Sequence, residues 1–220
     1  MAMLPIVIAR RPITSPHRWA AALFSTRLWF CTLLWSSALL WLGLCLPLAA
    51  ADTEPANEGR FLVATAQLEG TSFQEAVILI THYSERGATG LTINRPTDIP
   101  LQDAFPHNDH LQQRADPLYL GGPVSSNAIF VLLRTDRPQP TMHRIAKNIY
   151  FATAQHAFSD LRAGHSRIYA GYAGWMPGQL QAEIARGDWL VVNIDPDIIF
   201  ENDTTTIWPR LSKSWSGRWL

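Results

Sequence analysis

The chain has 220 residues and a mass of 24.6 kDa, which fits one domain of ordinary size together with a further segment. Its zero formal charge hides an asymmetry, because all 18 carboxylates lie at or after Asp52 while residues 1–51 carry four of the 18 basic residues. Residues 52–220 therefore have a net charge of −4, which argues against electrostatic capture of nucleic acid, and a hydrophobic content of 47% excludes disorder throughout.

The N-terminal segment has the pattern of a membrane-targeting signal. Residues 28–51 form a run of 24 residues without a formal charge, and a helix needs only about 20 such residues to cross a bilayer. Basic residues precede the run and carboxylates follow it, so residues 52–220 are expected on the outer side of the membrane. Three alanines at 49–51 are typical of a signal-peptidase site, with cleavage before Asp52.

Several fates of this segment remain open. A retained single-span anchor places the protein in the inner membrane, and a cleaved signal peptide releases it into the periplasm. The alternative is a misassigned start or a buried core helix, in which case the protein is cytosolic. Both cysteines, Cys31 and Cys45, lie in this segment, so the rest of the chain has no disulfide, no thiol nucleophile and no zinc site with cysteine ligands.

The remainder is predicted to be one domain at 61–212, between a polar linker at 52–60 and a short tail at 213–220. Short apolar runs bounded by turn residues predict its strands. The unbroken apolar run at 76–82 is typical of a strand buried on both faces, and a turn at 84–87 makes a hairpin with the next strand the simplest pairing. The predicted strands are 61–64, 76–82, 89–94, 118–120, 129–133, 149–151, 167–171 and 189–194.

Capping residues and helical spacing predict helices at 100–105, 153–163, 177–186 and 207–215. Thr153 is the cap of the second helix, and Gly164 and Gly187 are expected to end the second and third. The last helix, which interleaves apolar residues with Arg210, Lys213 and nearby Arg218, either docks on the domain or lies at a membrane interface. The elements predict a mixed α/β (α+β) fold, in which helices flank a mixed, largely antiparallel sheet and a hydrophobic N-terminal helix precedes it.

Four motifs stand out along the domain. They are GLTINRP at 90–96, LGGPV at 120–124, GYAGWMPGQL at 171–180 and GDW at 187–189. In order and spacing, over about residues 60–212, they resemble the YqgE/AlgH family of bacterial proteins. The resemblance implies a mixed α/β fold and a regulator of transcription, with no agreed catalytic residues. Members of that family are cytosolic and lack a leader, so if residues 1–51 export the domain, a direct role on nucleic acid is excluded.

The glycines of these motifs have two interpretations. The stretch at 171–180 leads into a helix whose N-terminal amides can hold an anion, or it makes a tight turn in which Tyr172 and Trp175 pack on the sheet. Gly121 and Gly122 allow a close crossing of two backbones or form a ligand loop. The tight turn and the crossing are the simpler interpretations.

The candidate ligand-binding residues follow from the motifs. Arg95 follows a strand, where its guanidinium binds a carboxylate or phosphate ligand or forms an ion pair with a carboxylate such as Asp188. If Arg95, Gly122 and Gln179 meet in space, the motifs form one polar pocket. The candidate set is Asn94, Arg95, Gly121, Gly122, Tyr172, Gly174, Trp175 and Gln179.

The sequence shows no catalytic signature. His107, His110, Asp103 and Asp109 are of the types that hold a divalent metal, but their loose spacing favours a polar loop. His82, at the end of an apolar strand, is typical of a structural histidine. A G-x-S-x-G nucleophile motif is missing, so no catalytic residue, metal or cofactor is predicted.

These observations favour a non-catalytic domain, exported or anchored in the membrane through residues 28–51, that binds a small molecule or a partner protein. Two alternatives remain. One is a cytosolic regulator of transcription, as the family resemblance implies. The other is an unrecognised enzyme that acts through an ionisable group such as His82.

Overall fold

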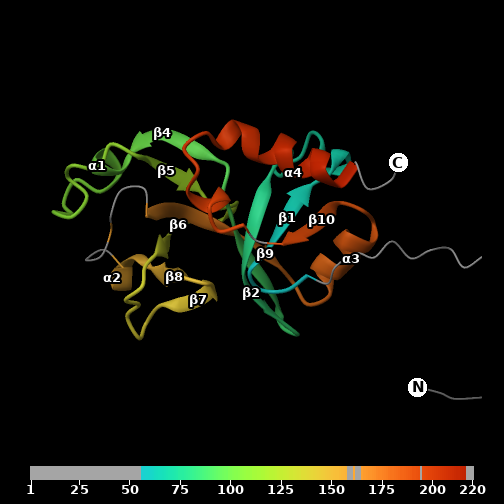
Figure 1. Cartoon of the computed structure of the whole chain (residues 1–220), viewed down its shortest axis with the longest axis horizontal. Helices are drawn as coiled ribbons and strands as arrows, with labels where there is room; N and C mark the ends of the chain where they lie inside the picture. The colour runs from blue at the N-terminus through green and yellow to red at the C-terminus, as the bar shows by residue number, and fades with distance from the viewer. Residues whose placement is uncertain (1–55, 158–160, 162–164, 194, 217–220) are drawn as a thin grey trace, which may run out of the picture. The chain divides into compact units, whose positions relative to one another are not determined.

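The computed structural model describes residues 56–216 apart from 158–160, 162–164 and 194 (Figure 1). The chain divides into two compact units, and all described residues belong to the second, Ala50–Leu220. The predicted hydrophobic helix and its cleavage site lie outside the described residues. Within the described part, no helix combines the length and the apolar character needed to cross a membrane.

The described residues form a sheet of ten strands. The strands are β1 Arg60–Ala64, β2 Val77–Ser84, β3 Gly87–Thr92, β4 Pro96–Pro100, β5 Pro117–Leu120, β6 Val124–Arg134, β7 His143–Ala146, β8 Ile149–Thr153, β9 Ser166–Trp175 and β10 Trp189–Asn193. Their order is β10-β1-β2-β3-β9-β6-β8-β7, and β5 joins β4 to β9. Every pairing among these strands is antiparallel except that of β5 with β9, which confirms the prediction of a mixed, largely antiparallel sheet.

Two strands, β4 and β7, have no counterpart among the predicted ones. β4 begins and ends with proline and pairs only with β5, and proline in strands is confined to such edge positions. β7 has four residues, of which two are exposed and charged or polar, so it shows no run of apolar residues. Neither strand carries the hydrophobic pattern from which a strand is predicted, and both exist because a neighbouring strand is available for pairing.

The helices are short. They are α1 Leu101–Ala104, α2 Ala154–Ala157, α3 Gln179–Ala185 and α4 Ile207–Ser216. Of the predicted helix at 153–163, the structure describes one turn, α2; residues 158–160 and 162–164, with the expected terminator Gly164, lie outside the described residues. α3 begins later than predicted, because Gly178 adopts a left-handed φ of +77° immediately before it. Gly187, with a φ of +83°, follows the end of α3 as predicted.

Strand β2 separates two apolar clusters. Val77 and Leu79 belong to one cluster, Ile78 and Ile80 to the other, and all four side chains are fully buried. This confirms that the apolar run is buried on both faces. Each of these side chains contributes about 1.5–3 kcal/mol to the free energy of unfolding by its burial. Helix α3 supplies Leu180 to the second cluster.

Helix α4 packs on the first cluster (Figure 1). Ile207 is fully buried, and the indole Nε1 of Trp208 donates a hydrogen bond of 2.8 Å to the carbonyl of Ala64 in β1. On its outer side the guanidinium of Arg210 pairs with Glu201 at 2.6 Å. For its described part, the C-terminal helix therefore docks on the domain, because its apolar face is already in contact with the sheet.

Residues 56–60, which the sequence assigns to the linker, are part of the folded unit. Ala56 is buried in the second cluster. The backbone N–H of Gly59 donates to the carbonyl of Ile80 at 2.9 Å, and the carboxylate of Glu58 contacts the imidazole of His143. Polar composition predicts exposure, but here the polar side chains and the backbone find partners on β2 and β7.

Candidate functional site

The predicted site residues do not form one pocket. Strands β3 and β9 run antiparallel, with Ala88 opposite Trp175, so residues that follow β3 lie at the other end of the pair from residues that follow β9. Seven residues separate Ala88 from Arg95, which corresponds to about 20 Å of extended chain. Arg95 and Gln179 therefore lie at opposite ends of the β3–β9 pair.

Gly121 and Gly122 lie between these ends, where the chain crosses β9. The N–H of Gly121 donates to Ala170 and its carbonyl accepts from Thr92, both at 2.9 Å. A Cβ atom on Gly121 would lie 2.2 Å from the carbonyl oxygen of Gly171. A Cβ on Gly122, whose φ is +157°, would lie 2.2 Å from the carbonyl carbon of Tyr172. The close backbone crossing is thereby confirmed, and protein backbone occupies the space that a ligand loop would need.

Asn94 and Arg95 hold the loop before β2. The side chain of Asn94 accepts from the N–H of Val77 and donates to the carbonyl of Glu75, both at 2.9 Å. Arg95 donates to the carbonyls of Ser72 and Gln74, the latter at 2.9 Å, and its partial burial lowers the pKa of the guanidinium. Glu75 has a φ of +56°, a left-handed conformation that these contacts stabilise.

The ion pair of Arg95 with Asp188 is not present. Asp188 pairs instead with Arg186, at 2.6 Å between Nη2 and Oδ2. Charge alone made Asp188 a candidate partner, whereas the strand register leaves Arg95 beside the carbonyls of the loop at 72–74.

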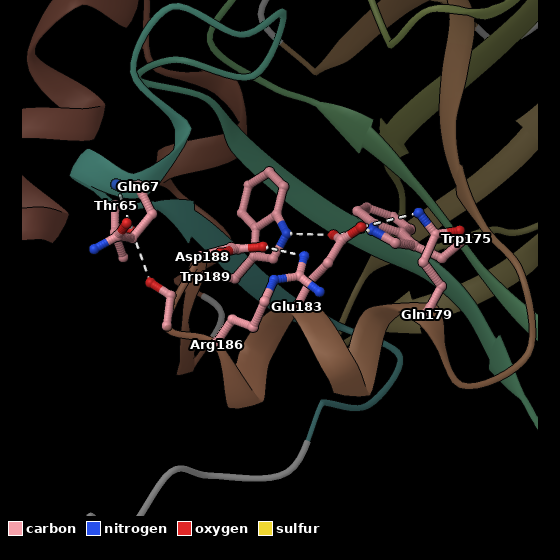
Figure 2. Close-up of polar contacts among 9 residues, drawn as sticks. Thr65, Gln67, Trp175, Gln179, Glu183, Arg186, Asp188 and Trp189 are labelled. Atoms are coloured by element: carbon pink, nitrogen blue, oxygen red, sulfur yellow. Dashed lines mark hydrogen bonds and ion pairs between the residues drawn. The ribbon is translucent and has the colours of Figure 1, made fainter.

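At the end of the β3–β9 pair where β9 leads into α3, the carboxylate of Glu183 accepts three hydrogen bonds (Figure 2). Its Oε2 accepts hydrogen bonds from the indole Nε1 of Trp175 and of Trp189, each at 2.8 Å. Its Oε1 accepts from Nε2 of Gln179 at 2.9 Å. The two indole rings meet edge to face, with centroids 6.1 Å apart. One carboxylate thus joins β9, α3 and β10; we call Trp175, Gln179, Glu183 and Trp189 the Glu183 network.

Glu183 is absent from the sequence-predicted set. A signal for it was present, since Trp175, Gln179 and Glu183 follow one another at intervals of four residues, and residues four apart lie on one face of a helix. Trp175 precedes the helix, however, so the helical spacing does not by itself place it near Glu183. The two side chains meet because the chain turns at 176–178 and brings the indole of Trp175 to α3.

The GDW motif at 187–189 belongs to the same region (Figure 2). The hydroxyl of Thr65 donates to the carbonyl of Gly187 at 2.7 Å, and the N–H of Thr65 donates to the carbonyl of Asp188 at 3.0 Å. Phe73, in the loop held by Asn94 and Arg95, packs edge to face on Trp189 at 5.6 Å. Phe73 therefore links the loop held by Asn94 and Arg95 to Trp189, which also donates to Glu183.

The turn between β9 and α3 presents an exposed surface above this network. Residues 176–179 are all exposed, and the side chain of Met176 is 73% exposed, the most exposed of the large hydrophobic side chains in the described part of the chain. The amide oxygen of Gln179 accepts from the N–H of Met176 at 3.0 Å. Farther along α3, Gln181 donates to the hydroxyl of Tyr83 in β2 at 2.6 Å. We call residues 176–179 the docking turn.

Tyr172 and Gly174 lie on the opposite face of β9 from Trp175, because successive side chains of a strand alternate between faces. Tyr172 packs edge to face on Phe130 at 5.8 Å in the first cluster. A Cβ on Gly174 would lie 3.1 Å from the ring of Tyr172. The motif at 171–180 therefore makes the predicted tight turn, but only Trp175 of its two aromatic residues packs beneath α3.

The three candidate histidines, His82, His107 and His110, are solvent-exposed. His82 is exposed on β2, next to an irregularity in its pairing with β3. His107 and His110 are exposed in the turns after α1, and the side chain of Asp109 accepts from Gln112. Among residues 56–216, as far as they are described, His, Cys, Asp and Glu form no group of three or more that could hold a metal ion.

Comparison with known proteins shows extensive similarity. A family model described as AlgH-like matches residues 61–219. A UPF0301 protein of Methylococcus capsulatus is 34% identical over 180 residues, which are 76% of this chain and 94% of that relative. A UPF0301 protein of Acidovorax sp. is 36% identical over 169 residues, 69% of this chain and 85% of the relative.

Two solved structures resemble the domain. The solution structure of the AlgH protein from Pseudomonas aeruginosa has a TM-score of 0.57 and 28% identity, over 72% of this chain and 87% of that chain. A crystal structure of a protein from Corynebacterium diphtheriae has a TM-score of 0.64 and 24% identity, over 74% of this chain and 88% of that chain, and this likeness concerns the fold alone.

Proposed function

The chain belongs to the AlgH-like family, and from this premise we propose that it is a non-catalytic binding domain that takes a partner protein on its docking turn, residues 176–179. The family is uncharacterised, so the proposal rests on the site. The observation that carries it is the exposed side chain of Met176 on a turn whose base is held by the Glu183 network.

Physical chemistry favours this surface for binding a protein. Methionine is enriched in protein interfaces, because its flexible and polarisable side chain adapts to the shape of a partner. The docking turn itself is held by the hydrogen bonds of Gln179 to Met176 and Glu183, so a partner would not have to order it on binding. Glu183 itself has a structural role here, since its carboxylate accepts hydrogen bonds from Trp175, Gln179 and Trp189.

Photo-crosslinking tests this proposal. A benzoylphenylalanine in place of Met176, in the full chain expressed in its own host, is expected to give one discrete crosslinked adduct. The matched control carries the same residue in place of Gln113, which is also exposed but lies in the turns after α1. The adduct should weaken when Gln179 is changed to alanine in the Met176 variant, because the turn loses its anchor. Equal adducts at both positions, or none at Met176, would contradict the proposal.

We further propose that the domain is exported or anchored through residues 28–51, on the sequence pattern alone. Fractionation of a C-terminally tagged chain, with N-terminal sequencing of the product, tests this. The expected product is either a periplasmic chain that starts at or near Asp52 or an intact chain in the inner membrane whose domain is digested by protease from the periplasmic side. A soluble cytosolic product would contradict export and favour the alternative of a regulator of transcription.

A further inference from the structure

The charges of the domain are unevenly distributed. Residues 137–159 contain three basic residues, Arg137, Arg144 and Lys147, and no carboxylate. The remaining residues of 52–220 hold eleven basic residues against eighteen carboxylates. A mildly acidic domain thus carries a basic segment that includes the whole of the hairpin formed by β7 and β8. Residues 204–220, with Arg210, Lys213 and Arg218 and no carboxylate, are a second such segment.

The basic side chains of this segment are solvent-exposed. Arg137, Arg144 and Lys147 are all exposed, and His143 is 54% exposed. Lys147 stands at the tip of the hairpin, beside Asn148, whose φ of +60° closes the turn. We call residues 137–153 the basic hairpin; it lies at the far end of the sheet from β10 (Figure 1).

Among the contacts of the described residues, two carboxylates meet the basic hairpin. Glu58 contacts His143, and Asp136 accepts from the side chain of Asn148 at 2.7 Å. Neither of them pairs with Arg144 or Lys147 in these contacts. The hairpin therefore keeps a positive surface in spite of the acidic character of the rest of the domain.

The basic hairpin adjoins the point where the chain enters the folded unit. Glu58 contacts His143 of β7, and a Cβ on Gly59 would lie 2.7 Å from the carbonyl oxygen of Ile145. Ala56, the first described residue, is buried, and four residues, 52–55, lie between it and the end of the uncharged run. Four residues span at most about 14 Å when fully extended.

We propose that the basic hairpin binds the anionic phospholipid surface of the membrane that residues 28–51 enter. This inference rests on the anchoring proposed above. The four-residue connection keeps residue 56 within about 14 Å of the end of the uncharged run, which is less than two Debye lengths of about 8 Å at physiological ionic strength. The exposed Arg137, Arg144 and Lys147 are then attracted to anionic headgroups.

The full chain in lipid vesicles provides the test. Cys31 and Cys45 are first changed to serine, and a single cysteine then replaces the exposed Thr141 in the loop before β7 and carries an NBD fluorophore. The vesicles contain phosphatidylethanolamine with about 30% phosphatidylglycerol, or phosphatidylcholine alone. The readout is quenching of NBD by spin-labelled lipid, and Gln113→Cys serves as the control position.

Quenching at residue 141 is expected to be at least about threefold greater in anionic than in neutral vesicles and to fall when ionic strength is raised to roughly 1 M. It should disappear in the variant that combines Arg137→Gln, Arg144→Gln and Lys147→Gln. Residue 113 should respond to neither change.

Three results would overturn the inference. They are equal quenching in anionic and neutral vesicles, quenching that survives in the triple variant, and an NBD response to duplex DNA that exceeds the response to anionic vesicles. Reconstitution inserts the anchor by itself, so these results are independent of where fractionation places the chain in the cell. The vesicle experiment therefore tests the binding of the basic hairpin alone, and the fractionation experiment tests export.

Discussion

Replacing Gly121 with alanine is expected to lower the free energy of unfolding by about 3 kcal/mol or more, enough to prevent folding in a domain of ordinary stability. The new Cβ would lie 2.2 Å from the carbonyl oxygen of Gly171 and 2.8 Å from Cδ2 of Leu91. The leucine can change its rotamer, but the carbonyl belongs to β9, which pairs with β3, β5 and β6 and cannot shift without loss of those pairings.

A second glycine variant separates this steric effect from a conformational one. Gly70 has a φ of +74° and no atom within 4 Å of its Cβ position, so Gly70→Ala should cost only about 1 kcal/mol, the strain of a left-handed alanine. Urea unfolding followed by tryptophan fluorescence measures both variants. If Gly121→Ala costs no more than Gly70→Ala, the crossing of the two backbones is wrong.

Replacing Glu183 with alanine is expected to lower the free energy of unfolding by about 2–5 kcal/mol. The carboxylate accepts from the indole N–H groups of Trp175 and Trp189, both of which are buried, and each donor left without an acceptor costs about 1–3 kcal/mol. Glu183→Gln keeps a carbonyl oxygen as an acceptor, so its free energy of unfolding should fall by only about half as much as that of Glu183→Ala.

The matched control is Glu85→Ala, at an exposed carboxylate in the turn between β2 and β3, for which a change within about 0.5 kcal/mol is expected. Urea unfolding gives the free energies, and the fluorescence of the native state reports the changed surroundings of the two indoles. A Glu183→Ala variant as stable as the Glu85→Ala variant would show that the carboxylate does not hold Trp175 and Trp189 together.

Much of the fold follows from local patterns. The apolar run at 76–82 predicts β2 and its burial on both faces, because alternate residues of one strand must face opposite sides of a sheet. Gly187 predicts the end of α3, since a left-handed residue after a helix satisfies its last carbonyls. β4 and β7 escape prediction, because strands of four or five residues with proline or charged side chains are stabilised by their neighbours and not by their own pattern.

The candidate site was predicted only in part. The motif at 171–180 leads to Trp175 and Gln179, which do share one network. Arg95 had two interpretations, a ligand contact or an ion pair with a carboxylate such as Asp188. The pair with Asp188 is not found, because two opposite charges in a sequence carry no information about the distance between them. Glu183 was missed because the four-residue spacing that links it to Trp175 begins before the helix, and because its other partner, Trp189, lies on β10.

The sequence by itself determined the family and the mixed, largely antiparallel sheet, both of which depend on residue type and order along the chain. For Gly121 and Gly122 it offered a backbone crossing or a ligand loop, and the tertiary structure decided for the crossing. Only the tertiary structure decided which motifs meet. The antiparallel register of β3 and β9 separates Arg95 from Gln179. Helix α3, which connects β9 to β10, brings Glu183 to both Trp175 and Trp189. Register is set by strand pairing across the whole sheet, so no local pattern contains it.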